Sequence, residues 1–320
     1  LAANGSAYAF RADADVDLAG FTLNVGDNAV PANGGGMILN AGANIIGSGK
    51  INSGNTALNV YVSGTSSVYV PISNTRNNAT NTLSTSNVAA PAVFTKFGPG
   101  TLELGAVNTF QGNVSVNQGT LSLTAANVIP TFGNLNAVTG SIVTIRPGAS
   151  VVLNDNNQEF GNLSGTAIGN SVLNFGGTLN LGTANLTVGR EGSTQIFSGQ
   201  LIGGGASQIT KIGGGTLTLD NWDTSIPNSL GTLQVSQGNV SAWMNDNSWA
   251  TPTGFASAIP SSTTIKLTGG QFTALSIGDS TSNQQRINLG NNVVHSGGDS
   301  ILRTDRASGS GSKKLLVFGT

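Results

Sequence analysis

Apolar and polar residues alternate in short runs along the chain, and Gly or Asn separates each run from the next. Leu102 and Leu104 alternate with polar neighbours, and residues 114–116 and 121–123 repeat the pattern. A period of two residues predicts β-strands that bury one face. Strands this short cannot close a core alone, so we expect them to stack in successive turns that bury each other's Leu and Val.

One segment of this kind occurs twice. Residues 95–102 read TKFGPGTL and residues 210–217 read TKIGGGTL. Each copy is followed by a related second half, VNQG at 116–119 and VSQG at 235–238, and the connection between the halves is longer in the second copy. Insertions confined to one connection are typical of a stacked repeat, and the glycines are expected at tight corners.

The alternation therefore predicts an all-β fold, a single right-handed parallel β-helix (β-solenoid) with irregular loop insertions. Further strands are expected at 21–25, 37–39, 45–46, 57–62, 264–267, 272–277, 286–289 and 301–303. The side chains expected to point inward are Leu102, Leu104, Leu121, Leu123, Leu217, Leu219 and Val235. Glu103 falls on the opposite face, where its loss is expected to cost little stability.

We expect one continuous β-helix over residues 1–320. Its parts are N-terminal turns at 1–93 with a polar loop at 72–92, the best-matching repeats at 94–220, a Trp-containing loop insertion at 221–258, and C-terminal turns at 259–320 that continue or are truncated. The apolar run LLVF at 315–318 is predicted to be a strand that can template further strands.

The repeated segment resembles the autotransporter-associated β-strand repeat of bacterial autotransporter passengers and related surface proteins. The pattern T-K-x-G-x-G-T-L-x-L is met at 95–104, N-T-aromatic-x-G at 108–112 and G-T-L-x-L at 119–123. The second copy matches over 210–219 and departs at 221–230, where N-T-aromatic-x-G is replaced. The resemblance implies a passenger-type β-helix outside the cell or on the bacterial outer-membrane surface, and it implies an architecture rather than an active site.

The composition narrows the classes of function. The 320 residues include 46 Gly and no Cys, only 8% are charged, and the net charge is −1. A chain without Cys has no disulfide framework or thiolate metal site, and the charge gives no basic footprint for nucleic acid. No apolar run is long enough for a membrane helix, and no targeting segment is recognisable, so we interpret the chain as part of a longer secreted protein that needs no cofactor.

Two groups of residues are candidates for metal or proton chemistry. Asp13, Asp15 and Asp17 form a D-x-D-x-D run, which is either a set of calcium ligands or one solvated face of a strand. The second reading is favoured, because the Gly and distal Glu of a helix–loop–helix calcium loop are missing. His295 is the single histidine, and a lone His without a paired carboxylate is not expected to catalyse or bind metal.

The three tryptophans, Trp222, Trp243 and Trp249, lie close together in the sequence. Exposed rings there would suit a carbohydrate-binding platform, whereas buried rings would only anchor a loop. Asp220 and Asp223 beside Trp222 are the nearest approach to an acid pair, and the other carboxylates are scattered. We therefore expect a non-enzymatic protein.

The sequence as a whole predicts an extracellular structural protein: a rigid stalk, an adhesin passenger or a fibre subunit of a bacterial surface. The alternative is a carbohydrate-binding β-helix and, less favoured, a polysaccharide-cleaving enzyme. The expected partners are the chain itself in a homopolymeric fibre, other surface components or a glycan. Nucleic acid and membrane insertion of this segment are not expected.

Overall fold

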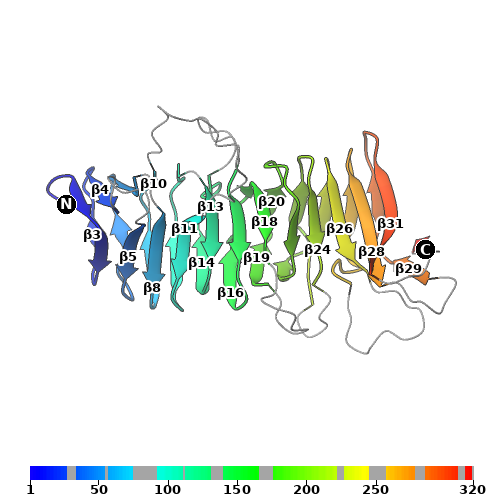
Figure 1. The fold of residues 1–320 in the computed structure, drawn as a ribbon, viewed down its shortest axis with the longest axis horizontal. Coiled ribbons are helices and arrows are strands. Elements are labelled where there is room, and N and C mark those ends of the chain that lie inside the picture. Colours follow the sequence, from blue (N-terminus) through cyan, green and yellow to red (C-terminus); the bar gives the residue numbers. More distant parts are fainter. Residues whose placement is uncertain are drawn as a thin grey trace.

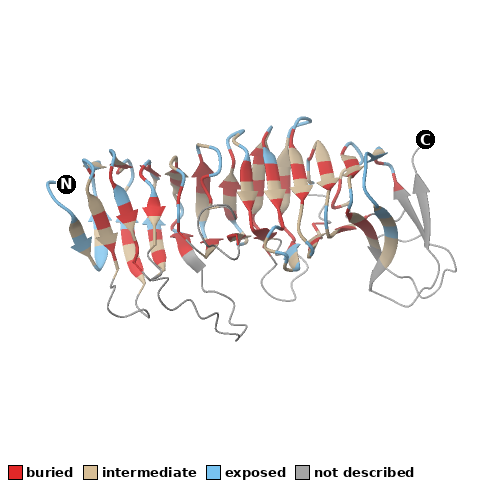
Figure 2. Cartoon of the chain, turned by 90° about the horizontal axis from the view of Figure 1, so that it is seen from above, coloured by how far each residue is buried: buried red, intermediate tan, exposed pale blue. Residues whose placement is uncertain are grey.

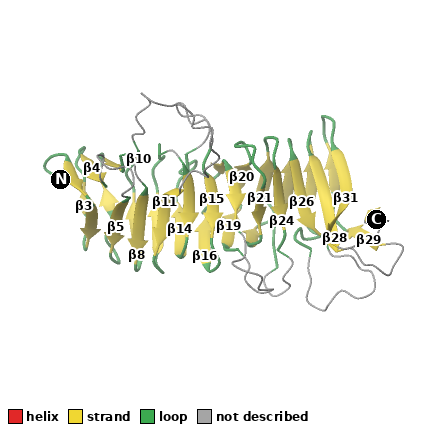
Figure 3. Ribbon diagram, in the orientation of Figure 1, coloured by secondary structure: helices red, strands yellow, loops and turns green. Residues whose placement is uncertain are grey.

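The computed structural model of the protein describes residues 1–26, 34–54, 57–74, 92–110, 112–130, 140–165, 176–221, 227–244, 257–277, 285–308 and 314–318. Within these ranges every regular element is a β-strand (Figure 3). The part of the chain that is described accordingly holds no helix that could span a membrane. The predicted all-β class is confirmed.

The strands stack in parallel along the long axis (Figure 1), and successive strands of the first turns belong in rotation to three sheets that run side by side. The four-stranded sheet contains β1 (Gly5–Ala7), β4 (Thr22–Val25), β7 (Lys50–Asn52) and β10 (Ile72–Ser73). The seven-stranded sheet contains β2 (Ala9–Ala12), β5 (Gly35–Leu39), β8 (Leu58–Val62), β11 (Ala92–Phe97), β13 (Asn113–Val116), β15 (Ile142–Ile145) and β18 (Asn162–Ser164). The eight-stranded sheet contains β3 (Val16–Asp17), β6 (Ile45–Ile46), β9 (Thr65–Val68), β12 (Thr101–Leu104), β14 (Gly119–Leu123), β16 (Ala149–Val152), β19 (Thr178–Gly182) and β22 (Gln200–Gly203).

Three further sheets hold the C-terminal strands. The six-stranded sheet contains β17 (Gln158–Phe160), β20 (Asn185–Val188), β23 (Gln208–Lys211), β25 (Thr232–Val235), β27 (Thr264–Leu267) and β30 (Val293–His295). The five-stranded sheet contains β21 (Gln195–Phe197), β24 (Thr216–Leu219), β26 (Asn239–Trp243), β28 (Gln271–Ile277) and β31 (Ile301–Ser308). β29 (Gln285–Leu289) pairs with β32 (Lys314–Phe318).

Parallel register places like residues above one another, so the core consists of ladders that run from strand to strand. One ladder passes from Leu58 through Phe94, Val114 and Val143 to Leu163, and each of these side chains is at most 1% exposed. Buried positions alternate with outward positions along most strands, as Figure 2 shows. The seven side chains predicted to point inward are confirmed as buried.

Side-chain amides join the four-stranded sheet to the six-stranded sheet. Asn108 Oδ1 accepts the Ile72 N–H at 2.8 Å, and Asn108 Nδ2 donates to the Val128 carbonyl at 2.9 Å. The Val128 N–H donates in turn to Oε1 of Gln158, on β17, at 3.0 Å. The amides thus take the place of backbone ladder bonds where the chain has no regular strand.

The other two lines of strands are continued in similar ways. A parallel bridge between Gly165 and Phe197 links the seven-stranded sheet to the five-stranded sheet. Beyond β22, Asn228 Oδ1 accepts the Leu201 N–H at 2.7 Å and Asn228 Nδ2 donates to the Ala258 carbonyl at 2.8 Å. Three lines of contact therefore follow the axis from the first sheets to the last.

The predicted parts of the chain are only partly described. Most of the polar loop predicted at 72–92 lies outside the described residues. The segment 221–258, predicted as a loop insertion, contains two regular strands, β25 and β26. Both continue the apolar–polar alternation, TLQV and NVSAW, which the tryptophans obscured at the level of sequence.

Candidate functional site

A lysine at the end of β11 is fully buried. The alternation of β11 directs Phe94 and Lys96 inward and Phe97 outward, and Lys96 is 0% exposed. Its Nζ donates to the carbonyl oxygens of Gly98, Gly100 and Gln118 at 2.6, 2.5 and 2.9 Å. Three acceptors around one ammonium satisfy a charge that would otherwise be costly to bury. We call Lys96 and these three carbonyls the lysine corner.

The second copy of the motif builds a related corner, in which the Gly213 carbonyl takes the place of the Gly98 carbonyl. Lys211, at the end of β23, is also 0% exposed, and its Nζ donates to the carbonyl oxygens of Ile212 and Gly213 at 2.7 and 2.9 Å. Burial lowers the pKa of both Lys96 and Lys211 to about 8. At neutral pH both side chains therefore still carry the ammonium that the carbonyl oxygens accept from.

Each corner requires a glycine on the next turn. Gly119 adopts φ +67°, and a Cβ there would lie 2.4 Å from the Gly100 oxygen and 2.6 Å from Lys96 Nζ. Gly238 adopts φ +64° and stands in the same relation to Lys211. The shared Q-G step of the two copies thus leaves room for the buried ammonium.

The two corners occupy different sides of the molecule. Lys96 belongs to the seven-stranded sheet, whereas Lys211 belongs to the six-stranded sheet, which continues the four-stranded one. The motif is therefore a local unit of strand, glycine corner and strand that can occupy either side.

An apolar stripe crosses the outer face of the seven-stranded sheet beside the Lys96 corner. Ile38, Tyr61 and Phe97 are in-register neighbours on β5, β8 and β11, and they are 44%, 43% and 39% exposed. The ring of Tyr61 lies over Gly98, where a Cβ would be 3.0 Å from Tyr61 Cε2. Gly98 of the lysine corner thus also packs against the Tyr61 ring outside it. We call Ile38, Tyr61 and Phe97 the apolar stripe.

The comparisons with known proteins single out this same part of the chain. Residues 94–123 match the family described as the Passenger-associated-transport-repeat. The chain carries an autotransporter passenger repeat. No curated protein and no solved structure matches the chain. The resemblance seen in the sequence is thereby confirmed for residues 94–123.

The passenger repeat runs from β11 to the end of β14, so it contains the whole Lys96 corner together with Gly119. Its conspicuous T-K-x-G-x-G and Q-G steps are the residues that build the corner. Sequence reasoning identified the motif but missed the burial of its lysine, although the alternation in FTKF places Lys96 on the same face as Phe94.

Glu103 within the passenger repeat makes side-chain hydrogen bonds that the sequence pattern did not predict. Its Oε2 accepts hydrogen bonds from Ser67 Oγ and Tyr69 Oη, both at 2.9 Å. The Tyr69 ring lies against Gly105, where a Cβ would be 2.3 Å from Tyr69 Cδ1. The carboxylate therefore links two neighbouring turns, so the loss of Glu103 is now expected to cost more stability than the sequence pattern indicated.

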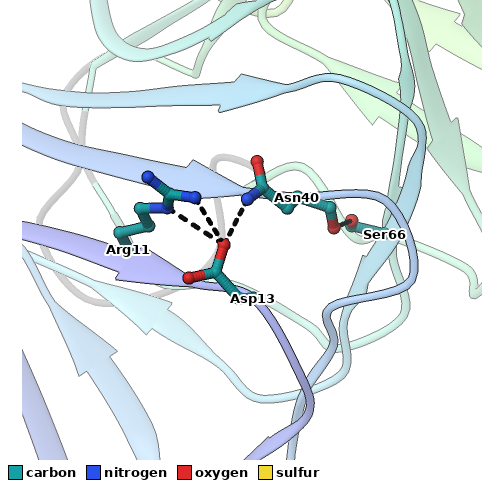
Figure 4. A network of polar contacts seen from close by, with 4 residues as sticks. All are labelled: Arg11, Asp13, Asn40 and Ser66. Atoms are coloured by element: carbon teal, nitrogen blue, oxygen red, sulfur yellow. Dashed lines mark hydrogen bonds and ion pairs between the residues drawn. The ribbon is translucent and has the colours of Figure 1, made fainter.

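The D-x-D-x-D carboxylates bind three different sets of partners. Asp13 pairs with Arg11 at 2.8 Å and also accepts a bond from Asn40 (Figure 4). Asp15 accepts from the backbone and side chain of Asn44, and Asp17 accepts the Ala19 N–H at 2.7 Å. Among the described residues no three potential metal ligands of this kind cluster. Only Asp17 lies in a strand, β3, whereas Asp13 and Asp15 lie in the connection between β2 and β3, so the three carboxylates are acceptors at a turn and do not share one strand face.

The structure describes one of the three tryptophans that the sequence offers as candidate binding residues. Trp243 ends β26, is half-buried and packs against the core. Trp222, Trp249 and Asp223 lie outside the described residues. Asp220 is half-buried, and burial raises the pKa of its carboxyl, with a hydrogen bond to Ser198 acting in the opposite direction.

His295 lies near the C-terminal end of the stack. Its Nε2 is 3.0 Å from the Gly298 carbonyl oxygen. It lines a cavity of about 500 Å³ together with Leu267, Val293, Asn291 and further residues of the last turns. His295 is in register with Leu267 on β27, but its side chain is exposed, and none of the described residues that line the cavity is a carboxylate.

Proposed function

We propose that the chain is a single right-handed β-solenoid that serves as a rigid, non-enzymatic segment of a bacterial surface or secreted protein. The observation that carries this proposal is the passenger repeat at 94–123, set within parallel ladders that continue on both sides of it.

The links between sheets support one solenoid rather than several domains. Asn108 and Asn228 each connect a regular strand to the turn that follows it, and the Gly165–Phe197 bridge joins two sheets directly. Such nearest-neighbour contacts are how a repeat protein transmits stability along its axis. A parallel crossover of this kind is right-handed in nearly all known folds.

The use of the polar side chains supports a structural rather than a catalytic role. Glu103 and the acidic residues of the first turns accept hydrogen bonds from neighbouring turns. A catalytic acid or base needs a free face toward substrate and a partner that tunes it. Carboxylates that accept hydrogen bonds from neighbouring turns are poorly placed to act as a catalytic acid or base.

The proposed setting is outside the cell, with the chain contributing to a stalk, an adhesin passenger or a fibre subunit. Its partners would be other surface components or further copies of itself. Neither a cofactor nor nucleic acid has a part in the proposal, and the net charge of −1 gives no electrostatic attraction to nucleic acid.

Electron microscopy and small-angle scattering of the purified chain test the proposal. Neighbouring strands lie ~4.8 Å apart, so the seven-stranded and five-stranded sheets in line span about 55 Å. Rigid rods at least this long are expected, and a globular or bent two-body particle would contradict a single solenoid. End-to-end growth with concentration would favour the fibre subunit over the stalk.

A further inference from the structure

The proposed structural role makes no use of the apolar stripe of Ile38, Tyr61 and Phe97. Apolar side chains scattered singly on a surface need no explanation, but three in register on neighbouring turns form a contiguous patch. We propose that this stripe binds a neutral glycan, whose pyranose rings lie with their C–H faces on Tyr61 and Phe97.

The size of the stripe favours a small ligand over a protein. With exposures of 44%, 43% and 39%, its three side chains present about 250 Å² of accessible surface, since a whole aromatic side chain buries ~150–250 Å². A stable protein–protein interface needs about 800 Å² on each partner. The stripe is therefore too small to hold a second copy but large enough for two or three sugar units.

The spacing also fits a glycan chain. Successive in-register residues lie ~4.8 Å apart along the axis, a distance close to the length of one pyranose unit in an extended glycan. Each turn would thus meet one sugar. The Tyr61 ring lies against Gly98, so the ring already has few rotamers open to it before a glycan binds. Such preorganisation lowers the entropic cost of association.

The surroundings of the stripe favour a neutral sugar. Arg11, the in-register neighbour of Ile38, is paired with Asp13 at 2.8 Å. The adjacent ladder carries the half-buried amide of Asn59, which pairs in register with the buried Thr95. The Asn59 amide is a group that orients hydroxyls by hydrogen bonding, whereas an anionic ligand would call for unpaired cations.

An immobilised array of neutral and acidic oligosaccharides tests the proposal, with the full chain as the probe. Neutral glycans should be retained, and Tyr61→Ala and Phe97→Ala should each weaken retention about threefold to tenfold, as expected for losing one aromatic contact. Tyr61→Phe keeps the ring and should bind like the wild type. Ile212→Ala is the matched control, because Ile212 follows Lys211 as Phe97 follows Lys96, but the residues that follow the in-register partners of Lys211 are Gly189 and Ser236, which carry no large apolar side chain.

Failure to retain any neutral glycan, or retention by Tyr61→Ala and Phe97→Ala that equals retention by the wild type, would overturn the proposal. Far-UV circular dichroism confirms that each variant is folded. Two further measurements test whether a second copy of the chain or a membrane binds the stripe instead of a glycan. Sedimentation that shows a wild-type dimer lost in Tyr61→Ala would assign the stripe to a second copy, and co-sedimentation with phosphatidylcholine vesicles lost in the same variant would assign it to a membrane; either result replaces the glycan.

Discussion

Replacing Lys96 by Met tests the lysine corner directly. Met keeps an unbranched side chain of similar length but removes the ammonium. In the native corner Nζ donates to the carbonyl oxygens of Gly98, Gly100 and Gln118 at 2.5–2.9 Å. The Gly100 oxygen also accepts the Thr120 N–H at 3.1 Å, so it keeps a partner in the variant.

The expected cost comes from the two remaining oxygens, those of Gly98 and Gln118. A buried acceptor left without its donor costs about 1–3 kcal/mol, so the pair predicts a loss of about 2–6 kcal/mol. Part of this is offset, because Met carries no charge that must be desolvated on folding. We therefore expect Lys96→Met to lower the free energy of unfolding by about 2–4 kcal/mol.

Urea unfolding followed by far-UV circular dichroism measures this loss by linear extrapolation. Lys50 on β7 is exposed, and Lys50→Met is the control that should change stability by less than about 0.5 kcal/mol. Lys211→Met should resemble Lys96→Met, since Lys211 builds the second corner. If Lys96→Met were as stable as Lys50→Met, the ammonium would not be what holds the corner.

The pH dependence of this loss is a second test of the same corner. Burial lowers the pKa of Lys96 from 10.5 to about 8, so between these values the unfolded chain binds a proton that the folded chain does not. The contribution of Lys96 to stability then rises with pH across this window and is constant below it. The gap between wild type and Lys96→Met should widen from pH 8 to 10.5. A gap that narrows would mean that the carbonyl oxygens raise the pKa instead.

Two further pairs of substitutions test the glycine of the corner and the inner and outer faces of the strands. Gly119→Ala should cost about 2–5 kcal/mol, because it combines a positive φ with a Cβ 2.4 Å from a carbonyl oxygen; Gly148→Ala, with φ +78° and nothing within 4 Å, should cost only about 1 kcal/mol, and equal costs would remove the steric argument. Leu104→Ala should cost about 2–5 kcal/mol for a buried truncation, and Glu103→Ala about 1 kcal/mol for its two half-exposed hydrogen bonds. Thermal or urea unfolding ranks all four, and a larger loss in the Glu103 variant than in the Leu104 variant would reverse the assignment of inner and outer faces.

Local pattern was enough to predict most of the strands. The period of two residues in TLEL placed Leu102 and Leu104 in the core, and the same rule held for Leu217 and Leu219 in the second copy. This works because the pleat sends successive side chains to opposite faces whatever the strand pairs with. The glycine corners followed for the same reason, since a positive φ is a property of a single residue.

The candidate sites depended on residues brought together from different turns. The alternation of FTKF directs Lys96 inward, yet a lysine is rarely buried, and only the Gln118 carbonyl of the next turn completes its set of acceptors. The aromatic residues considered from sequence were the tryptophans, whereas the exposed stripe combines Ile38, Tyr61 and Phe97.

The register between turns is what the sequence alone left open. The strands that carry Ile38, Tyr61 and Phe97 are separated by connections of different lengths, so spacing along the chain does not reveal that these residues are neighbours. Parallel pairing aligns them, because backbone hydrogen bonding fixes which residue lies above which. The sequence determined which residues face inward and where the corners lie, and the tertiary structure decided which outward residues share a surface and how a buried ammonium is satisfied.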